Sequence, residues 1–203
     1  MTLAILLGAL FFALAAFVGA LLGNAAADNI EPFDDGPQPG KPPAVILVFA
    51  CAAIGAIIAP RAADPFQVVT IAIVCGGLVA AWCCDVRSGI MPDTFTLVPL
   101  LVLLGTAVWQ HSWMVLASAV IVFVPFAIAA VLSRGTGMGW GDVKLAALGG
   151  AVLGAELSLV SFALACLIAV IVHYTMRGKR GAIALGPYLA AAIGLGIPFG
   201  LLR

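Results

Sequence analysis

Long apolar runs alternate with short polar connections along the whole chain. A helix needs roughly 20 apolar residues to cross a bilayer, and several of these runs reach or approach that length. Glycine and proline, which break helices, are frequent where one run gives way to the next. We therefore predict eight membrane segments, of which the sixth is short: residues 3–23, 44–59, 66–84, 94–108, 113–132, 142–154, 157–174 and 182–202.

The composition agrees with this pattern. Of the 203 residues, 64% are hydrophobic and 9% are charged, whereas soluble domains carry about 25% charged residues. We predict an all-α, polytopic membrane protein that forms one domain over residues 1–203. The first run lacks a basic segment before it and is followed by further runs, so we interpret it as a retained helix rather than a signal peptide. The net charge of zero argues against nucleic acid as a partner.

The longest polar stretch, residues 24–43, is acidic and rich in proline, and we predict a cytoplasmic loop there. It contains no cysteine. The five cysteines of the chain lie inside apolar runs, without Cys-x-x-Cys pairs or neighbouring histidines, so we interpret them as packing residues. We expect no disulfide framework, no metal site and no other cofactor. The cysteines are Cys51, Cys75, Cys83, Cys84 and Cys166.

The distribution of Lys and Arg predicts that the N-terminus lies outside the cytoplasm. In this orientation seven of the nine basic residues fall on the cytoplasmic side, and only Arg61 and Arg203 fall outside. The opposite orientation reverses this distribution and is disfavoured. The predicted segments 94–108 and 113–132 are two crossings, so the connections before and after them lie on the same face of the membrane.

Two polar stretches interrupt the apolar pattern, at residues 84–93 and 137–144. The first contains Asp85 and the second contains Asp142, each at the junction of a loop and a long apolar run. An ionisable side chain at the edge of a membrane segment is costly to keep there, so its presence indicates a function by default. Because both aspartates are predicted on the cytoplasmic face, they are candidates for a working pair.

Two aspartates that share a proton can hydrolyse a peptide bond. One carboxylate acts as the base on water, and the other, protonated, donates to the scissile carbonyl. Asp142 precedes a predicted helix, whose N-terminus favours negative charge, while Asp85 follows an apolar segment at a helix C-terminus. We therefore expect Asp142 to be the base and Asp85 to carry the proton. Gly139 and Gly141 would let a substrate strand approach, although simple helix packing explains glycines equally well.

Three motifs, in this order, resemble those of the type IV prepilin peptidases of the GxGD aspartic protease family. The first is Asp85 followed by the Ile-Met-Pro-Asp-Thr sequence at residues 90–94. The second is the Gly-Trp-Gly-Asp-Val-Lys-Leu sequence at residues 139–145. The third is the Ala-Leu-Gly-Pro-Tyr-Leu-Ala sequence at residues 184–190, which is similar to a segment of the family's last helix. The resemblance extends from about residue 66 to the C-terminus.

The resemblance implies a peptidase of the bacterial inner membrane that serves type IV pilus assembly or protein secretion. Such enzymes cut the basic leader from prepilins or pseudopilins just after a glycine, at the cytoplasmic face. The resemblance makes Asp85 and Asp142 the catalytic pair. It gives supporting roles to Pro92, Asp93, Gly139, Gly141, Lys144, Gly186 and Pro187. Asp93 remains a rival for the first catalytic position, or else a turn carboxylate that caps the next helix.

The loop at residues 24–43 departs from the long-form members of this family. Those members carry a zinc-binding insertion with two Cys-x-x-Cys pairs after the first helix and also N-methylate the new terminus. The loop here contains no cysteine, so the zinc-binding module is absent; the resemblance leaves methyltransferase activity open, because loss of the metal need not abolish it. Its four acidic residues would attract a basic leader, or the loop is only a solvated linker. They are Asp28, Glu31, Asp34 and Asp35.

Two other classes of protein fit part of the pattern. An ion- or proton-coupled transporter also places carboxylates at helix breaks near glycine-rich segments. The lack of an internal repeat, and the prediction that both aspartates lie near one face rather than at the midplane, favour the peptidase. In a structural membrane subunit, the third alternative, the polar motifs would be incidental.

Overall fold

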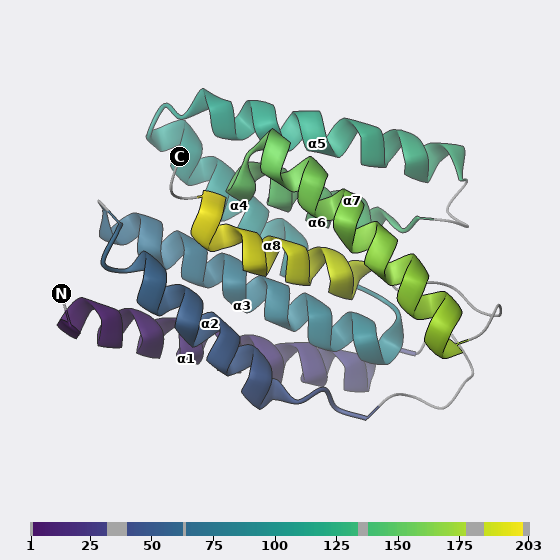
Figure 1. Ribbon diagram of the computed structural model, residues 1–203, viewed down its shortest axis with the longest axis horizontal. Helices are drawn as coiled ribbons and strands as arrows, with labels where there is room; N and C mark the ends of the chain where they lie inside the picture. Colours follow the sequence, from purple (N-terminus) through teal and green to yellow (C-terminus); the bar gives the residue numbers. More distant parts are fainter. Residues whose placement is uncertain (1, 32–39, 63, 134–137, 178–184, 201–203) are drawn as a thin grey trace.

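The computed structural model describes residues 2–31, 40–62, 64–133, 138–177 and 185–200. Over this part of the chain it contains eight α-helices and no strand, which confirms the all-α prediction. Most of the helices run along the long axis of the molecule (Figure 1). They are α1 (Thr2–Asn29), α2 (Ala44–Ile58), α3 (Pro65–Ser88), α4 (Asp93–Trp109), α5 (Trp113–Leu132), α6 (Trp140–Leu153), α7 (Ala155–Val172) and α8 (Gly186–Gly200), with a π-helical turn, His173–Arg177, after α7.

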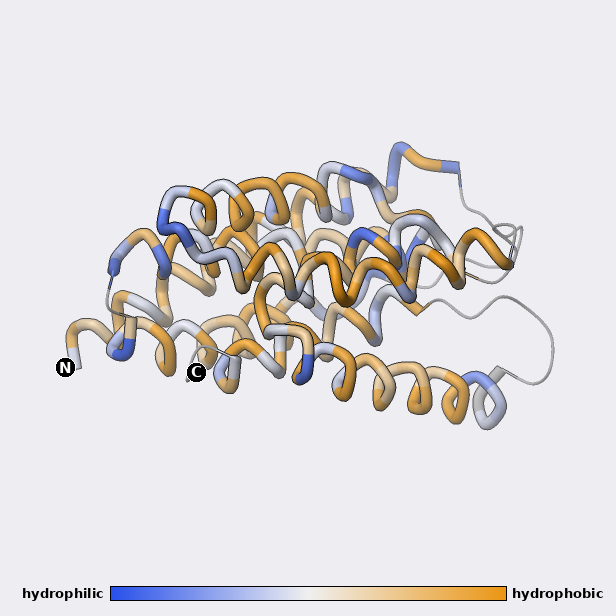
Figure 2. Tube along the Cα trace, turned by 90° about the horizontal axis from the view of Figure 1, so that it is seen from above, coloured by the Kyte–Doolittle hydropathy of each residue, from blue (hydrophilic) through white to orange (hydrophobic). Residues whose placement is uncertain are grey.

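Apolar surface covers the outside of the bundle. Four helices, α1, α3, α5 and α7 with its continuation to Thr175, are long and apolar enough to cross a membrane, and α2, α4 and α8 are shorter apolar helices. Large side chains such as Leu10, Met114 and Leu164 are exposed, which would be costly in water but not in lipid. Hydrophobic residues predominate along the helices in Figure 2. The chain is therefore a polytopic membrane protein, as its hydropathy predicts.

Helix α1 packs directly on the backbone of α3. A Cβ atom added to Gly19 would collide with the carbonyl oxygen of Gly76, and one added to Gly23 would lie 2.8 Å from the Cα of Ala80. Small residues are common at such contacts because they let two helix backbones approach closely in lipid. The contact holds the second half of α3, which carries Asp85, against α1.

The short helix α6 lies inside the bundle. It packs against α4, α5, α7 and α8, and every residue from Leu145 to Leu153 is buried. It ends at Gly154, whose φ of 80° allows α7 to begin at the next residue. The Ser158 hydroxyl donates a 2.8 Å hydrogen bond to the Gly149 carbonyl and secures this tight corner. Because other helices surround α6, its length of 14 residues leaves no polar backbone facing lipid.

Three helix boundaries differ by at least four residues from the sequence-based prediction, and one of them is the end of α3, which continues to Ser88 rather than stopping at residue 84. Helix α1 continues to Asn29, so residues 24–29 of the predicted loop are helical. The reason is a contact with a distant part of the chain, since Arg87 of α3 binds Asn24 and Asp28 there. The last helix begins at Gly186, whereas the prediction began it at residue 182, and residues 182–184 lie outside the described part of the chain.

Candidate active site

The structure brings the two predicted aspartates to the same end of the bundle. Asp85 lies in the last turn of α3, and Asp142 lies in the first turn of α6. The carboxylates are close enough to repel each other electrostatically. Helices α3 and α6 do not pack on one another, but α4 and α8 each pack against both of them. Asp85 and Asp142 therefore lie on two helices that are connected through α4 and α8.

The end of α3 is shaped by a glycine and a serine. Gly89 adopts a left-handed conformation with a φ of 66°, and its N–H donates a 2.9 Å hydrogen bond to the Asp85 carbonyl oxygen. The Ser88 hydroxyl donates to the Cys84 carbonyl at 2.9 Å. These contacts end the helix at Ser88, three residues after Asp85, which is only 8% exposed. The aspartate thus lies in apolar surroundings at a helix C-terminus.

Asp142 is fixed by the start of α6. The N-cap of the helix is Gly139, and the Asp142 carboxylate accepts a hydrogen bond from the backbone of that glycine. Asp142 is the third residue of the helix, and a hydrogen bond from the N-cap N–H to the side chain of the third residue is one of the two hydrogen bonds of a capping box. Asp142 is partly buried. Its side chain therefore has one fixed partner at a helix end whose dipole favours negative charge.

The third predicted motif reaches the same place through Gly186, the first residue of α8. A Cβ atom added to Gly186 would lie 2.6 Å from Asp85 Oδ2 and 2.5 Å from the terminal Cε of Met91. A Cβ added to Gly141, the residue before Asp142, would lie 3.2 Å from Met91 Cβ. The three motifs, which are far apart in the sequence, therefore converge around one methionine side chain.

The predicted supporting residues Asp93 and Lys144 form an ion pair. Asp93 is the first residue of α4, and Lys144 follows Asp142 by one residue in α6. One interpretation of the sequence had the Asp93 side chain capping α4. Instead, Pro92 occupies the N-cap position and the Asp93 carboxylate binds Lys144. The pair joins the start of α4 to the start of α6.

Arg87 is a residue of this region whose role the sequence analysis missed. Its guanidinium donates to the Asn24 carbonyl at 2.9 Å and to Asp28 Oδ1 at 2.6 Å, and the side chain is only 10% exposed. It therefore ties the end of α3 to the end of α1, two residues from Asp85. The sequence carries no local signal for this contact, because its partners lie about sixty positions earlier in the chain.

The same contact changes the picture of the acidic residues that follow the first helix. Asp28 is paired with Arg87 and lies 3.8 Å from Lys41 Nζ, so its charge is already balanced. Glu31 is exposed, and Asp34 and Asp35 lie outside the described residues.

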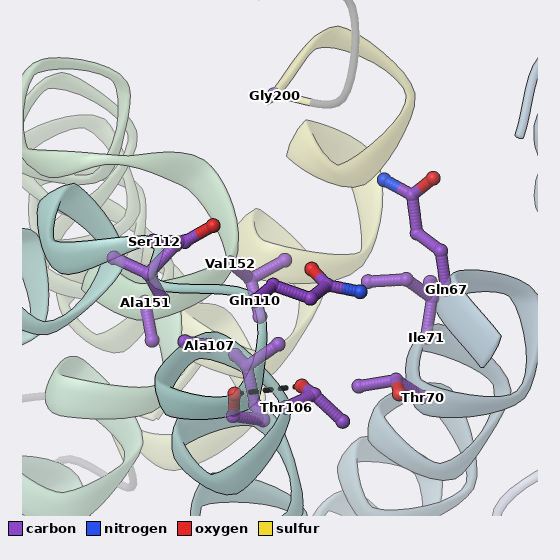
Figure 3. A pocket seen from close by; sticks show the side chains of 12 residues that line it. Gln67, Thr70, Ile71, Thr106, Ala107, Gln110, Ser112, Ala151, Val152 and Gly200 are labelled. Atoms are coloured by element: carbon purple, nitrogen blue, oxygen red, sulfur yellow. Dashed lines mark hydrogen bonds between the residues drawn. The ribbon is translucent and has the colours of Figure 1, made fainter. Parts of the chain in front are cut away.

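Other candidate sites contain less chemistry. Among the described residues, no group of three His, Cys, Asp or Glu side chains could hold a metal ion. The five cysteines are free, and all but Cys166 are buried, as packing residues are. A cavity of about 250 Å³ lies at the opposite end of α3 and α4 from the aspartates (Figure 3). Its polar side chains are uncharged: Gln67, Thr70, Thr106, Gln110 and Ser112.

Comparison with known proteins gives one match. The model of the type IV leader peptidase family matches residues 72–174, a range that contains Asp85, Asp142 and the Asp93–Lys144 pair. No curated protein matches the chain. No solved structure matches it.

Proposed function

The chain belongs to the type IV leader peptidase family, and from this membership we propose that it is a membrane-embedded aspartic endopeptidase of the GxGD class. Its substrates are type IV prepilins or pseudopilins, from which it removes the leader peptide. The observation that carries this proposal is the meeting of Asp85 and Asp142 at one end of the bundle, although 57 positions separate them in the chain.

The two helix ends support different roles for the two carboxyl groups. Asp142 lies at a helix N-terminus, where negative charge is favoured, and Asp85 lies at a helix C-terminus, where it is disfavoured. Asp142 then takes a proton from water, and the resulting hydroxide attacks the scissile carbonyl carbon. Asp85 gives its proton to the carbonyl oxygen, which produces a neutral gem-diol.

Collapse of the gem-diol completes the reaction. Asp142 returns its proton to the amide nitrogen, and the carbon–nitrogen bond breaks. Asp85 recovers a proton from one hydroxyl of the gem-diol as the new carboxyl group forms. Each aspartate ends the cycle in the protonation state in which it began, so hydrolysis consumes only water. The cycle is possible because the two carboxyl groups share one proton, so that one is ionised and the other protonated at the start.

The proposal places the reaction at the cytoplasmic face of the bacterial inner membrane. The distribution of Lys and Arg along the sequence supports this orientation, because seven of the nine fall on the same side as both aspartates in the predicted topology. Pro92, Gly139 and Pro187 are assigned to the framework of the site, together with the residues that contact Met91.

Single substitutions test the catalytic pair. A purified prepilin-like substrate is incubated with the wild type, with Asp85→Asn and with Asp142→Asn, and leader removal is measured. Each variant keeps the size of the side chain but loses the ability to exchange a proton. We expect each to lose at least about 100-fold of the cleavage rate, because acid–base catalysis contributes this much or more. Full cleavage by either variant would refute the assigned pair.

Asp64→Asn is the matched control for this experiment. Asp64 caps the other end of α3, where its side chain accepts a 3.0 Å hydrogen bond from the Phe66 N–H. Asparagine is an equally good N-cap, so the helix keeps its start. The control makes the same chemical change on the same helix, far from Asp85, and we expect it to retain wild-type cleavage.

A further inference from the structure

The connection between α3 and α4 is held at both of its ends. At its start, the Ser88 hydroxyl oxygen accepts a hydrogen bond from the Ile90 N–H at 3.3 Å. At its end, Asp93 is bound to Lys144 of α6. Only three residues, Ile90, Met91 and Pro92, lie between the left-handed Gly89 and Asp93. The position of Met91 is therefore fixed by its neighbours on both sides.

The Met91 side chain extends between the two catalytic elements. Its Cβ lies next to Gly141, which directly precedes Asp142. Its Cε lies 2.5 Å from the point where a Gly186 Cβ would be, and Asp85 Oδ2 lies 2.6 Å from that same point. The methyl group of the thioether therefore lies beside the Asp85 carboxyl. The side chain is only partly buried.

We propose that Met91 limits the size of the substrate residue that precedes the bond to be cut. The inference rests on the proposed function, because the bond must lie between Asp85 and Asp142 to be hydrolysed. A substrate backbone in that position passes the Met91 methyl group. A residue without a side chain has room there, whereas a branched side chain collides with the thioether.

Gly141 and Gly186 restrict how far the Met91 side chain can move. Methionine is unbranched and adapts to its neighbours more easily than leucine or isoleucine. Here its movement away from a substrate is limited, because it already packs on Gly141 along one part of its length and on Gly186 at its tip. Truncation of Met91 is the change that would open the space without altering either aspartate.

The experiment compares substrates that differ at one residue. Prepilin-like substrates carry Gly, Ala or Val immediately before the cleaved bond, and kcat/KM is measured for each with the wild type and with Met91→Ala. The ratio of the Val value to the Gly value reports discrimination. We expect Met91→Ala to raise this ratio at least about tenfold, since one methylene group in a pocket is worth about 10- to 200-fold. This ratio does not depend on the fraction of enzyme that is folded.

Two further variants sharpen the test. Met91→Leu keeps a side chain of similar volume, so it should keep the discrimination of the wild type. Met114→Ala makes the same truncation in α5, at a residue that is 79% exposed and lies at the opposite end of the bundle. It should leave all three values of kcat/KM unchanged.

The outcomes separate this inference from the function on which it rests. If Met91→Ala leaves the ratio unchanged, or lowers kcat/KM equally for all substrates, Met91 is a packing residue and the inference is wrong. The proposed function survives that result as long as the Gly substrate is cut in an Asp85-dependent reaction. If the wild type cuts none of the substrates, the proposed function itself fails, and the inference fails with it.

Discussion

Gly186 leaves room for the Asp85 carboxyl because it has a hydrogen atom where other residues have a Cβ. Any side chain at this position would meet both the Asp85 carboxyl and the Met91 methyl group. Both obstacles are the ends of side chains, which can move. A methyl group at position 186 would therefore leave the helix intact but displace the Asp85 carboxyl, which we propose to be catalytic. The absence of a side chain at position 186 is therefore required for the observed position of the Asp85 carboxyl.

Gly186→Ala should therefore separate activity from stability. We expect at least an approximately 100-fold loss of cleavage, since a misplacement of about 1 Å at a reacting group costs this much. Thermal unfolding should change little. Gly194→Ala in the same helix is the matched control, because no described atom lies within 4 Å of its added Cβ. That variant should cleave normally; equal losses in the two variants would contradict the explanation.

Helices are held in register around the site by two ionic contacts of different kinds. The Asp93–Lys144 pair joins the starts of α4 and α6 and is largely open to solvent on the Asp93 side. Such pairs contribute only about 0–1 kcal/mol to stability. Arg87 joins the ends of α1 and α3 and is nearly buried, and its Nε atom is buried without a hydrogen-bond partner in the described structure.

Removal of the Asp93–Lys144 pair should affect cleavage more than folding. Asp93→Asn and Lys144→Gln should each lower kcat/KM several-fold, because the ion pair sets how the Met91 connection lies against α6. Asp93→Lys and Lys144→Asp alone should lower kcat/KM further, because each places two like charges together. The double variant that combines them should recover part of that loss in the same cleavage assay. If the exchanged pair is as inactive as either single charge reversal, the two residues act separately.

Arg87→Gln should destabilise the bundle. The change leaves the Asn24 carbonyl and the Asp28 carboxylate without their nearly buried partner, and we expect a loss of about 1–3 kcal/mol in the free energy of unfolding. Unfolding in detergent, followed by circular dichroism, measures the effect. Lys41→Gln removes the other cation near Asp28, at 3.8 Å and 67% exposed, and should change stability little. A larger loss with Lys41→Gln would reverse this assignment.

At the scale of the whole molecule, the chemistry is confined to one end of an otherwise apolar bundle. Both aspartates, the Asp93–Lys144 pair and the Arg87 contacts lie there, while the cavity at the opposite end is lined only by uncharged side chains. This polarity matches a leader peptidase whose substrate presents its basic segment on one side of the membrane.

The orientation itself can be measured with introduced cysteines. Gly40→Cys lies before α2 at the end that carries the aspartates, and Gln110→Cys lies between α4 and α5 at the opposite end; both positions are exposed. An impermeant maleimide should label Gly40→Cys only in inverted vesicles and Gln110→Cys only in intact cells. The opposite labelling would place the active site outside the cytoplasm.

The sequence predicts elements better than it predicts contacts. Hydropathy located all eight helices, because each needs a long apolar run, and the polar breaks located Asp85 and Asp142. The extension of α1 to Asn29 was missed because Arg87, about sixty positions away, stabilises it. The place of Met91 beside Asp85 was missed for the same reason, since an apolar residue between polar ones gives no sign of what it touches in space.

The enclosed position of α6 has a consequence for how the enzyme is made. A helix of 14 residues that is followed at once by α7 is poorly suited to enter a bilayer alone. We expect α6 and α7 to insert together, as a hairpin that turns at Gly154. Asp142 would then reach Asp85 only after the ribosome has completed α7. Until then the nascent chain would carry Asp85 without its proposed partner, and cleavage could begin only once α6 and α7 have entered the membrane.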